Sequence, residues 1–345
     1  MEVSFPSSDR SFRIFGDLTL PKDGGESTAH EPIPAILVIA GSGPLDRNGN
    51  VSELLLRMDF NTSNQIAEHM VSPSERPIAV LSYDKRGVGK SIKKGDKNFY
   101  YRAGMMDLVS DAVEAIRFLA GHPRIDEKSI ALLGHSEGAI LLPLICEEAR
   151  KAGLEPVKGC IFYAGLGETV EDATKQQRER ILDEVQRETG FKGWLLRRVL
   201  TRDKLMKQHA DLMAKINSDG QPDFVSSHCG LVKTPAKWYR EHMSFDTRTA
   251  LADITCHCLA ITGCKDVQVR DEFCMMDRAA VLVPKAASIE VHRPANLTHA
   301  LRSLECPSKI LNVKQDYSRL GKKPLDPELL SITRNWCDRV LLGSE

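Results

Sequence analysis

Residues 129–138 have the sequence SIALLGHSEG, in which a short apolar run leads directly into the pattern Gly-x-Ser-x-Gly. The run SIALLG has the length and composition of a strand that is buried on both faces. A helical pattern begins at once after Gly138. A strand that turns sharply into a helix leaves no room for side chains beside the turn, which explains Gly134 and Gly138. We therefore expect this turn to project the Ser136 hydroxyl above the end of a sheet.

Strands of the same kind recur along the chain, and helical patterns lie between them. Further strands are predicted at 34–40 (PAILVIA), 77–83 (PIAVLSY), 160–164 (CIFYA), 256–262 (CHCLAIT) and 288–292 (SIEVH). Residues 106–120 carry an apolar stripe at helical spacing, with Asp111 and Glu114 expected on the opposite face. This alternation predicts an α/β fold with a mostly parallel central sheet and helices on both faces.

The chain changes character after the strand at 160–164. Residues 168–249 are polar, helix-prone and rich in charges of both signs. We expect their helices to bury one face and to expose the other. The apolar residues expected on such a buried face are Leu195, Leu196, Val199, Leu200, Leu212, Met213 and Ile216. The sequence thus predicts one α/β domain, 1–167 and 250–345, interrupted by an inserted helical cap at 168–249.

A serine hydroxyl needs a nearby base and a carboxylate that orients this base before it acts as a nucleophile. The strand at 256–262 is followed by Asp266, and the strand at 288–292 is followed by His299. Both residues come just after the carboxyl end of a strand, where ligands gather in open α/β sheets. Asp266 taken alone also fits the start of a helix. The order Ser136, Asp266, His299 makes a catalytic set the better interpretation.

An acyl-transfer site also needs backbone N–H groups that stabilise a developing oxyanion. Glu137 supplies one candidate at the start of a helix, and the glycine-rich loop after 34–40 supplies Ser42 and, second, Gly43. Asp46 and Arg47 in the same loop are interpreted as holding it against residues 84–87 rather than as a substrate clamp. The loop lacks the Lys-Ser/Thr ending of a phosphate-binding loop.

Composition excludes several classes of protein. The 345 residues include 47 Lys+Arg and 47 Asp+Glu, so there is no basic excess of the kind that nucleic-acid binders use. Nine cysteines, an odd number, are interpreted as reduced thiols, and the Cys256 and Cys258 pair lacks the second pair of a zinc site. Residues 1–15 have no signal-peptide pattern, and no apolar run approaches the roughly 18 residues of a spanning helix. We expect a cytoplasmic protein with neither a bound metal nor a membrane span.

The motifs together resemble the α/β-hydrolases, and within them the carboxylesterase branch grouped with dienelactone-hydrolase-like and serine-aminopeptidase-like enzymes. The matching segments are GSGPLDRNGN, SYDKRGVGKS, GHSEGA, TGCKDVQV, THALR and PLDPELL. The resemblance implies Ser136 as nucleophile, Asp266 as orienting acid, His299 as base and Ser42 and Glu137 as oxyanion donors. Two features depart from this branch: Ala40 replaces a histidine that usually precedes the GSGP loop, and residues 303–323 have no clear place, the pocket entrance being one candidate.

The function expected on these grounds is cofactor-independent cleavage of a small carboxylic ester by a serine hydrolase. Amide, peptide or thioester hydrolysis and acyl transfer use the same three side chains and remain alternatives. A non-catalytic ligand-binding protein of the hydrolase fold is an alternative of another class, as is recruitment of a partner protein through the charged cap. The expected partner is a small-molecule ester, and the sequence does not predict the oligomeric state.

Overall fold

The computed structural model describes residues 1–21, 31–51, 58–72, 76–227, 232–269 and 275–343. At its centre lies a sheet of eight strands in the order β1-β2-β4-β3-β5-β6-β9-β10. The strands are β1 (Glu2–Pro6), β2 (Arg13–Thr19), β3 (Ile33–Ile39), β4 (Ala79–Tyr83), β5 (Ile125–His135), β6 (Gly159–Tyr163), β9 (His257–Ile261) and β10 (Ser288–His292). In this sheet β4, β3, β5, β6, β9 and β10 are parallel to one another. The pairs β1–β2 and β2–β4 are antiparallel.

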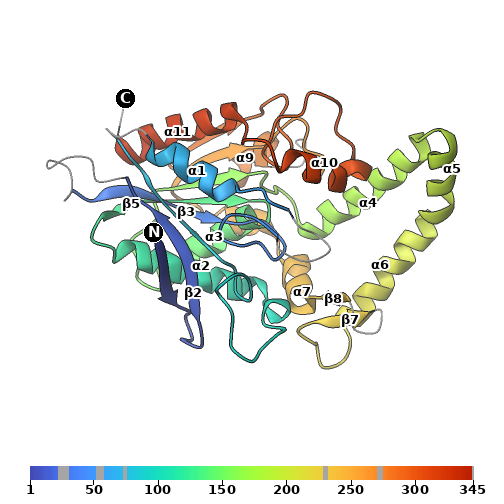
Figure 1. Ribbon diagram of the computed structural model, residues 1–345, viewed down its shortest axis with the longest axis horizontal. Helices are drawn as coiled ribbons and strands as arrows, with labels where there is room; N and C mark the ends of the chain where they lie inside the picture. Colours follow the sequence, from blue (N-terminus) through green and yellow to red (C-terminus); the bar gives the residue numbers. More distant parts are fainter. Residues whose placement is uncertain (22–30, 52–57, 73–75, 228–231, 270–274, 344–345) are drawn as a thin grey trace.

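Helices cover both faces of this sheet (Figure 1). Those that pack on the sheet are α1 (Thr62–Val71), α2 (Met105–Ala120), α3 (Glu137–Lys151), α9 (Met275–Leu282) and α11 (Pro327–Leu342). α1 and α11 share one apolar core with the sheet, and α2, α3 and α9 share the other. The predicted α/β architecture and the six predicted strands are confirmed, each within a few residues of its expected bounds.

The remaining helices and a hairpin lie mostly between β6 and β9. They are α4 (Val170–Arg187), α5 (Gly190–Val199), α6 (Arg202–Ile216), β7 (Val225–Ser227), β8 (Val232–Thr234), α7 (Ala236–Ser244) and α8 (Thr247–Leu251). α4 and α6 extend away from the sheet and α5 joins their far ends (Figure 1). Residues 303–323 contain η2 (Ile310–Asn312) and α10 (Val313–Leu320). The carboxylate of Glu184 in α4 accepts the N–H groups of Ile310 and Leu311, so this segment is bound to α4.

Two expectations about helix faces are wrong. Asp111 is 1% exposed rather than solvated, and its carboxylate pairs with Arg86 at 2.6 Å. Burial raises the pKa of Asp111 to about 6, and the charge of Arg86 opposes that rise. Leu195 and Val199 are exposed rather than buried, because the apolar stripe of α5 points away from α4. Ile216 of the same predicted stripe is buried as expected.

Candidate active site

Ser136 lies at the sharp turn between β5 and α3. Its backbone angles are φ 54° and ψ −114°, which residues other than glycine rarely adopt. A Cβ atom on Gly134 would lie 2.4 Å from the carbonyl carbon of Gly138, and one on Gly138 would lie 2.1 Å from the carbonyl oxygen of Ile39. Close approach of the backbone therefore requires both glycines, and the strained turn holds the serine hydroxyl at the carboxyl end of the sheet.

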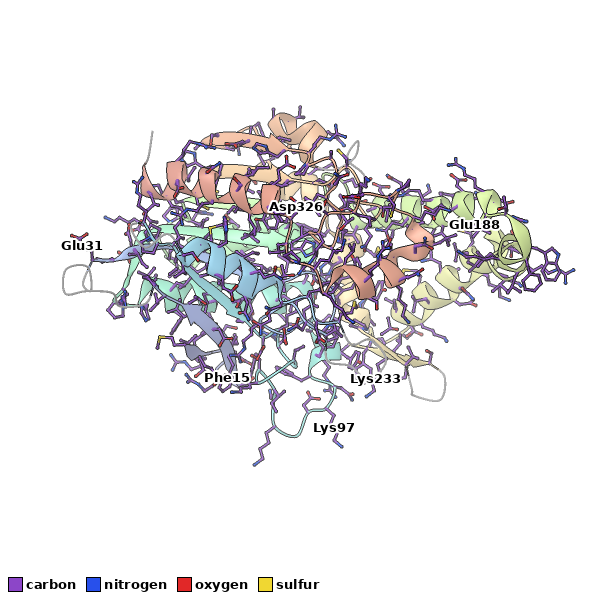
Figure 2. The ribbon with its side chains drawn as sticks, turned by 45° about the horizontal axis from the view of Figure 1, so that its top comes forward. Phe15, Glu31, Lys97, Glu188, Lys233 and Asp326 are labelled. Atoms are coloured by element: carbon purple, nitrogen blue, oxygen red, sulfur yellow. The ribbon has the colours of Figure 1, made fainter. Side chains whose placement is uncertain are left out.

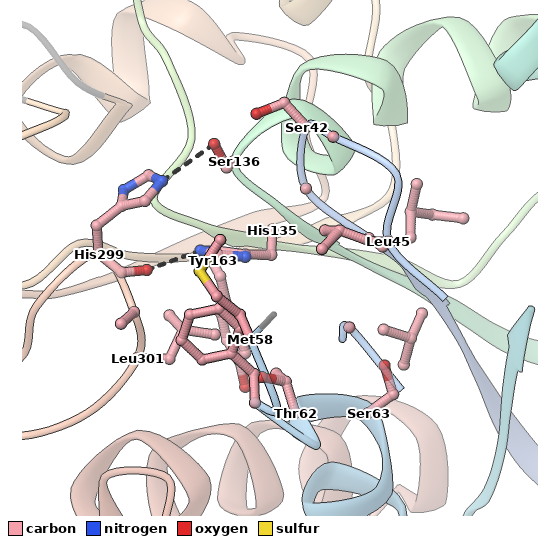
Figure 3. Close-up of a pocket in the computed structure, with 18 of the residues that line it drawn as sticks. Ser42, Leu45, Met58, Thr62, Ser63, His135, Ser136, Tyr163, His299 and Leu301 are labelled. Atoms are coloured by element: carbon pink, nitrogen blue, oxygen red, sulfur yellow. Dashed lines mark hydrogen bonds between the residues drawn. The ribbon is translucent and has the colours of Figure 1, made fainter. Parts of the chain in front are cut away.

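Asp266 and His299 reach Ser136 from the loops that follow β9 and β10. His299 Nε2 lies 3.1 Å from Ser136 Oγ (Figure 3), and His299 Nδ1 lies 2.7 Å from Asp266 Oδ2. The other carboxylate oxygen of Asp266 accepts the backbone N–H groups of Gln268 and Val269 at 2.8 and 2.9 Å. The carboxylate is therefore held in one orientation, and it favours the imidazole tautomer that leaves Nε2 free to accept a proton from Ser136.

His135, the residue before Ser136, fixes the loop that carries His299. Its Nε2 lies 2.9 Å from the carbonyl oxygen of His299 (Figure 3). A carbonyl oxygen only accepts, so Nε2 carries the proton of this bond. Burial, together with the charge that His299 gains on protonation, lowers the pKa of His135 to about 3. His135 is therefore a neutral donor at ordinary pH, a role that the sequence analysis did not predict.

The loop after β3 lies beside Ser136. A Cβ atom on Gly41 would lie 3.5 Å from Ser136 Cβ, which shows how closely this loop approaches the turn. Ser42 lies near Ser136 in the pocket (Figure 3), and Gly43 has a φ of 101° that favours glycine. Glu137 is the first residue of α3, so its N–H belongs to the free amino end of a helix. The three predicted oxyanion donors thus come from two segments that meet at Ser136.

Arg47 ties this loop to the sheet, as the sequence analysis expected. Its guanidinium hydrogen-bonds both carboxylate oxygens of Asp84, at 3.1 and 2.8 Å, and lies 2.9 Å from Asp17 and 3.1 Å from Glu2. Asp46 instead stabilises its own loop by accepting backbone N–H groups within it. Neither side chain is needed to explain substrate binding.

A buried cluster behind the turn was not predicted at all. The side chains of Lys85 and Glu137 are 7% and 3% exposed, and Lys85 Nζ lies 2.5 Å from Glu137 Oε2. The same ammonium group donates to the carbonyl oxygen of Gly41. Lys85 therefore joins the loop after β3 to the residue that follows Ser136, which are the two sources of the expected oxyanion donors.

Helix α7 completes this cluster. Trp238 Nε1 donates to Oε1 of Glu137, and His242 Nε2 lies 3.3 Å from the same oxygen. Burial alone raises the pKa of Glu137, but the charge of Lys85 and the contact with His242 outweigh it and hold that pKa below its usual range. The only signal in the sequence was a lysine and a glutamate beside glycine-rich turns, which does not indicate that they pair.

An apolar pocket of about 250 Å³ adjoins Ser136 and His299. It is lined by Val38, Ile39, Ala40, Gly41, Ser42, Gly43, Pro44, Leu45, Gly49, Val51, Met58, Phe60, Thr62, Ser63, Ile66, Leu133, His135, Ser136, Tyr163, Gln268, His299, Ala300, Leu301 and Tyr317. Tyr317 comes from the unplaced segment 303–323, so that segment borders the pocket. No charged Lys, Arg, Asp or Glu side chain from the described residues lines it, which favours an uncharged group as its occupant.

Two kinds of feature are absent from the described part of the chain. Within it, no three His, Cys, Asp or Glu side chains are arranged to hold a metal ion. In the same residues, no helix is both long enough and apolar enough to cross a membrane.

Comparisons with known proteins bear on this geometry. No protein-family model matches the chain. Esterase EstD from Thermotoga maritima is 30% identical over 139 residues, which are 40% of this chain and 28% of that protein. Among solved structures, the α/β hydrolase GrgF from Penicillium sp. sh18 has a TM-score of 0.53 at 14% identity and covers 99% of both chains.

Two further solved structures are similar over most of this chain. The 2,6-dihydroxy-pseudo-oxynicotine hydrolase has a TM-score of 0.54 at 16% identity, covering 99% of this chain and 68% of that one. Est1E from Butyrivibrio proteoclasticus, solved with bound ferulic acid, has a TM-score of 0.51 at 12% identity, covering 93% of this chain and 98% of that one. Identities this low establish a shared fold and nothing finer.

Proposed function

Because the chain has the α/β-hydrolase fold, we propose that it is a serine hydrolase that cleaves a small carboxylic ester through an acyl-enzyme. The observation that carries this proposal is the continuous hydrogen-bonded arrangement of Asp266, His299 and Ser136 at the carboxyl end of the sheet. A protein that only bound a ligand would have no need of all three groups in this order.

In the proposed reaction, His299 Nε2 takes the proton of Ser136 Oγ as this oxygen attacks the carbonyl carbon of the ester. The carbonyl oxygen becomes an oxyanion and accepts hydrogen bonds from the backbone N–H groups of Glu137 and Ser42, with Gly43 as the second choice in the loop. His299 then protonates the departing alcohol oxygen, and the C–O bond of the ester breaks. His299 then deprotonates a water molecule, which attacks the acyl-enzyme, and it returns this proton to Ser136 Oγ as the bond to the acyl group breaks and the carboxylic acid leaves.

The pocket and the comparisons both support an ester as the substrate. The pocket beside Ser136 has no charged lining residue among the described ones, and its volume of about 250 Å³ is that of a small organic group. The partial sequence relative is named an esterase, and Est1E was solved with ferulic acid, a carboxylic acid. The steps above use only side chains and backbone groups of this chain together with one water molecule, so the proposed mechanism requires no cofactor. Thioester and amide cleavage follow the same steps and rank second.

The division into a catalytic domain, 1–167 and 250–345, and a cap, 168–249, is part of the proposal. Its support is that this helical segment leaves the sheet after β6 and returns before β9. Gln177 and Arg180 of α4 donate to the carbonyl oxygens of Gln268 and Val267, next to Asp266. The cap is thereby bound to the loop that carries the orienting acid.

The decisive experiment is covalent labelling with a fluorophosphonate, followed by mass spectrometry of the labelled peptide. The native protein should be labelled at Ser136, and Ser136→Ala should abolish both the label and ester turnover. Ser63→Ala removes a hydroxyl that also lines the pocket and should keep the label. If the folded native protein neither takes the label nor cleaves a panel of esters, the ligand-binding alternative replaces the hydrolase.

A further inference from the structure

The far end of the α4 and α6 pair differs chemically from the rest of the molecule. We call residues 187–207, which contain α5 and the first turns of α6, the helical tip. In Figure 1 it is the part of the chain furthest from the sheet, and Figure 2 shows its side chains beyond the labelled Glu188.

The apolar stripe of α5 faces outward. Phe191, Trp194, Leu195 and Val199 are 76%, 46%, 46% and 56% exposed, and their spacing places them on one face of the helix. The rings of Phe191 and Trp194 are stacked with their centroids 5.5 Å apart. A surface helix normally buries such a stripe, and exposed apolar patches usually mark a site of interaction.

The opposite face of α5 is anchored to α4, so the outward direction of the stripe is fixed. Arg197 donates to the carbonyl oxygens of Val185 and Glu188 at the end of α4. Gly193 is buried there, and a Cβ atom on it would lie 2.1 Å from the carbonyl oxygen of Glu188. Rotating α5 to bury its stripe would break these contacts. The exposed stripe is therefore presented by the fold.

Charge at the helical tip is strongly positive, although the whole chain is neutral. Its basic residues are Arg187, Lys192, Arg197, Arg198, Arg202, Lys204 and Lys207, and its acidic residues are Glu188 and Asp203. Glu188 pairs with Lys192 and Lys309, and Arg202 pairs with Glu179 of α4. The guanidinium of Arg198 lies over the ring of Trp194, 4.6 Å from its centroid. On the exposed face of α5, Lys192 and Arg198 thus lie among the apolar side chains, whereas Arg197 faces α4.

We propose that the helical tip docks the protein on the surface of an anionic lipid bilayer. Phe191, Trp194, Leu195 and Val199 enter the boundary between headgroups and acyl chains, and the exposed basic side chains of the tip, such as Lys192 and Arg198, contact the headgroup phosphates and carboxylates. A second copy of the chain is a poorer occupant, because a symmetric contact would bring two strongly positive surfaces together. The docking surface does not depend on the proposed ester chemistry.

The test is flotation of the full chain with vesicles of phosphatidylcholine alone and of phosphatidylcholine mixed with phosphatidylserine. The native protein should float with the mixed vesicles, much less with the neutral ones, and less as salt is added. The double substitution Phe191→Ser and Trp194→Ser should reduce the bound fraction at least about tenfold. Lys192→Gln with Arg198→Gln should reduce binding to the mixed vesicles and leave the weak binding to neutral vesicles unchanged.

A matched control removes equally exposed apolar side chains elsewhere. Ile92 and Val281 are 61% and 76% exposed, and the substitutions Ile92→Ser and Val281→Ser should leave vesicle binding intact. Circular dichroism and cleavage of a soluble ester should be unchanged in every variant, because none of these residues touches the pocket. The fluorescence of Trp194 gives a direct measure of its insertion. Its emission should shift to shorter wavelength with mixed vesicles, and Trp194→Phe should remove that shift.

Two results would overturn the proposal. One is that the native protein does not bind mixed vesicles, or that both double variants of the tip bind them as strongly as the native protein does. The other is a native dimer in sedimentation analysis that Phe191→Ser with Trp194→Ser converts to monomer without any vesicle binding in either form. The second result would assign the stripe to contact between copies of the chain.

Discussion

Removing the charge of Glu137 tests whether the buried cluster behind Ser136 supports the site. Glu137→Gln keeps the shape of the side chain and the backbone N–H, but it leaves the ammonium group of Lys85 buried without its carboxylate. Both side chains are less than a tenth exposed, so solvent screens the pair little. Removing one partner of a buried ion pair lowers the unfolding free energy by about 3–5 kcal/mol, and we expect Glu137→Gln to lower it by an amount in that range.

The same substitution, Glu137→Gln, should also change how the stability of the protein depends on pH. The pKa of Glu137 is lower in the folded protein than its usual value of 4.5. A carboxyl group with a lowered folded pKa contributes stability above its unfolded pKa and loses that contribution as the pH falls. The native protein should therefore lose stability on acidification below about pH 5, and Glu137→Gln should lose less over the same range.

Turnover should fall in the same variant. Lys85 also hydrogen-bonds the carbonyl oxygen of Gly41, so a displaced Lys85 releases the loop that carries Ser42. Loss of a complete oxyanion donor reduces kcat by about 10²–10³, and a donor that is shifted rather than removed should cost about tenfold. The effect should fall on kcat more than on KM, because the oxyanion forms only in the transition state.

Urea denaturation of the native protein, Glu137→Gln, Lys85→Met and the double variant measures the interaction free energy of the pair separately from the effect of each single substitution. The double substitution should be more stable than the sum of the two single losses predicts, because neither charge is then left buried alone. Lys285 and Asp253 form a pair at 2.7 Å on the surface, so Asp253→Asn is the control and should change nothing measurable. Strictly additive losses, or a single loss no larger than that control, would refute the role given to the cluster.

Three further predictions concern the same site. Asp266→Asn should lower kcat by about four orders of magnitude with little change in KM, because the amide favours the wrong imidazole tautomer; steady-state kinetics with a chromogenic ester checks this, and near-native turnover would contradict it. Gly138→Ala should lower the unfolding free energy by about 1–3 kcal/mol, since its Cβ would lie 2.1 Å from the carbonyl oxygen of Ile39; Gly121→Ala, where the nearest atom is 3.4 Å away, is the matched control in urea denaturation. Activity should rise with pH through one ionisation and then level, because in the proposed mechanism only a neutral imidazole accepts the serine proton and burial lowers the pKa of His135 to about 3; a profile of kcat/KM against pH that requires two histidine protonations would contradict this assignment.

The parts of the site that sequence predicts are those set by local rules. A strand, a tight turn and a helix require Gly134 and Gly138 wherever they occur, so the position of Ser136 follows from ten residues of sequence. Asp266 and His299 follow because parallel strands bring the loops at their carboxyl ends to one edge of the sheet. Lys85 and Glu137 obey no such rule, since their contact depends on how β4, α3 and α7 pack.

Helical periodicity shows that a stripe exists but not what covers it. In α2 the stripe packs on the sheet, and Asp111 at its flank is buried because Arg86 from the loop after β4 neutralises it. In α5 the same periodicity is present, yet Arg197 and Gly193 bind α4 and turn the apolar residues outward. The spacing of Leu195 and Val199 is identical in both interpretations, so only the tertiary contacts of the opposite face separate a core helix from a docking surface. Sequence periodicity therefore finds the stripe of α5 but not its exposure, and the exposure is what vesicle binding tests.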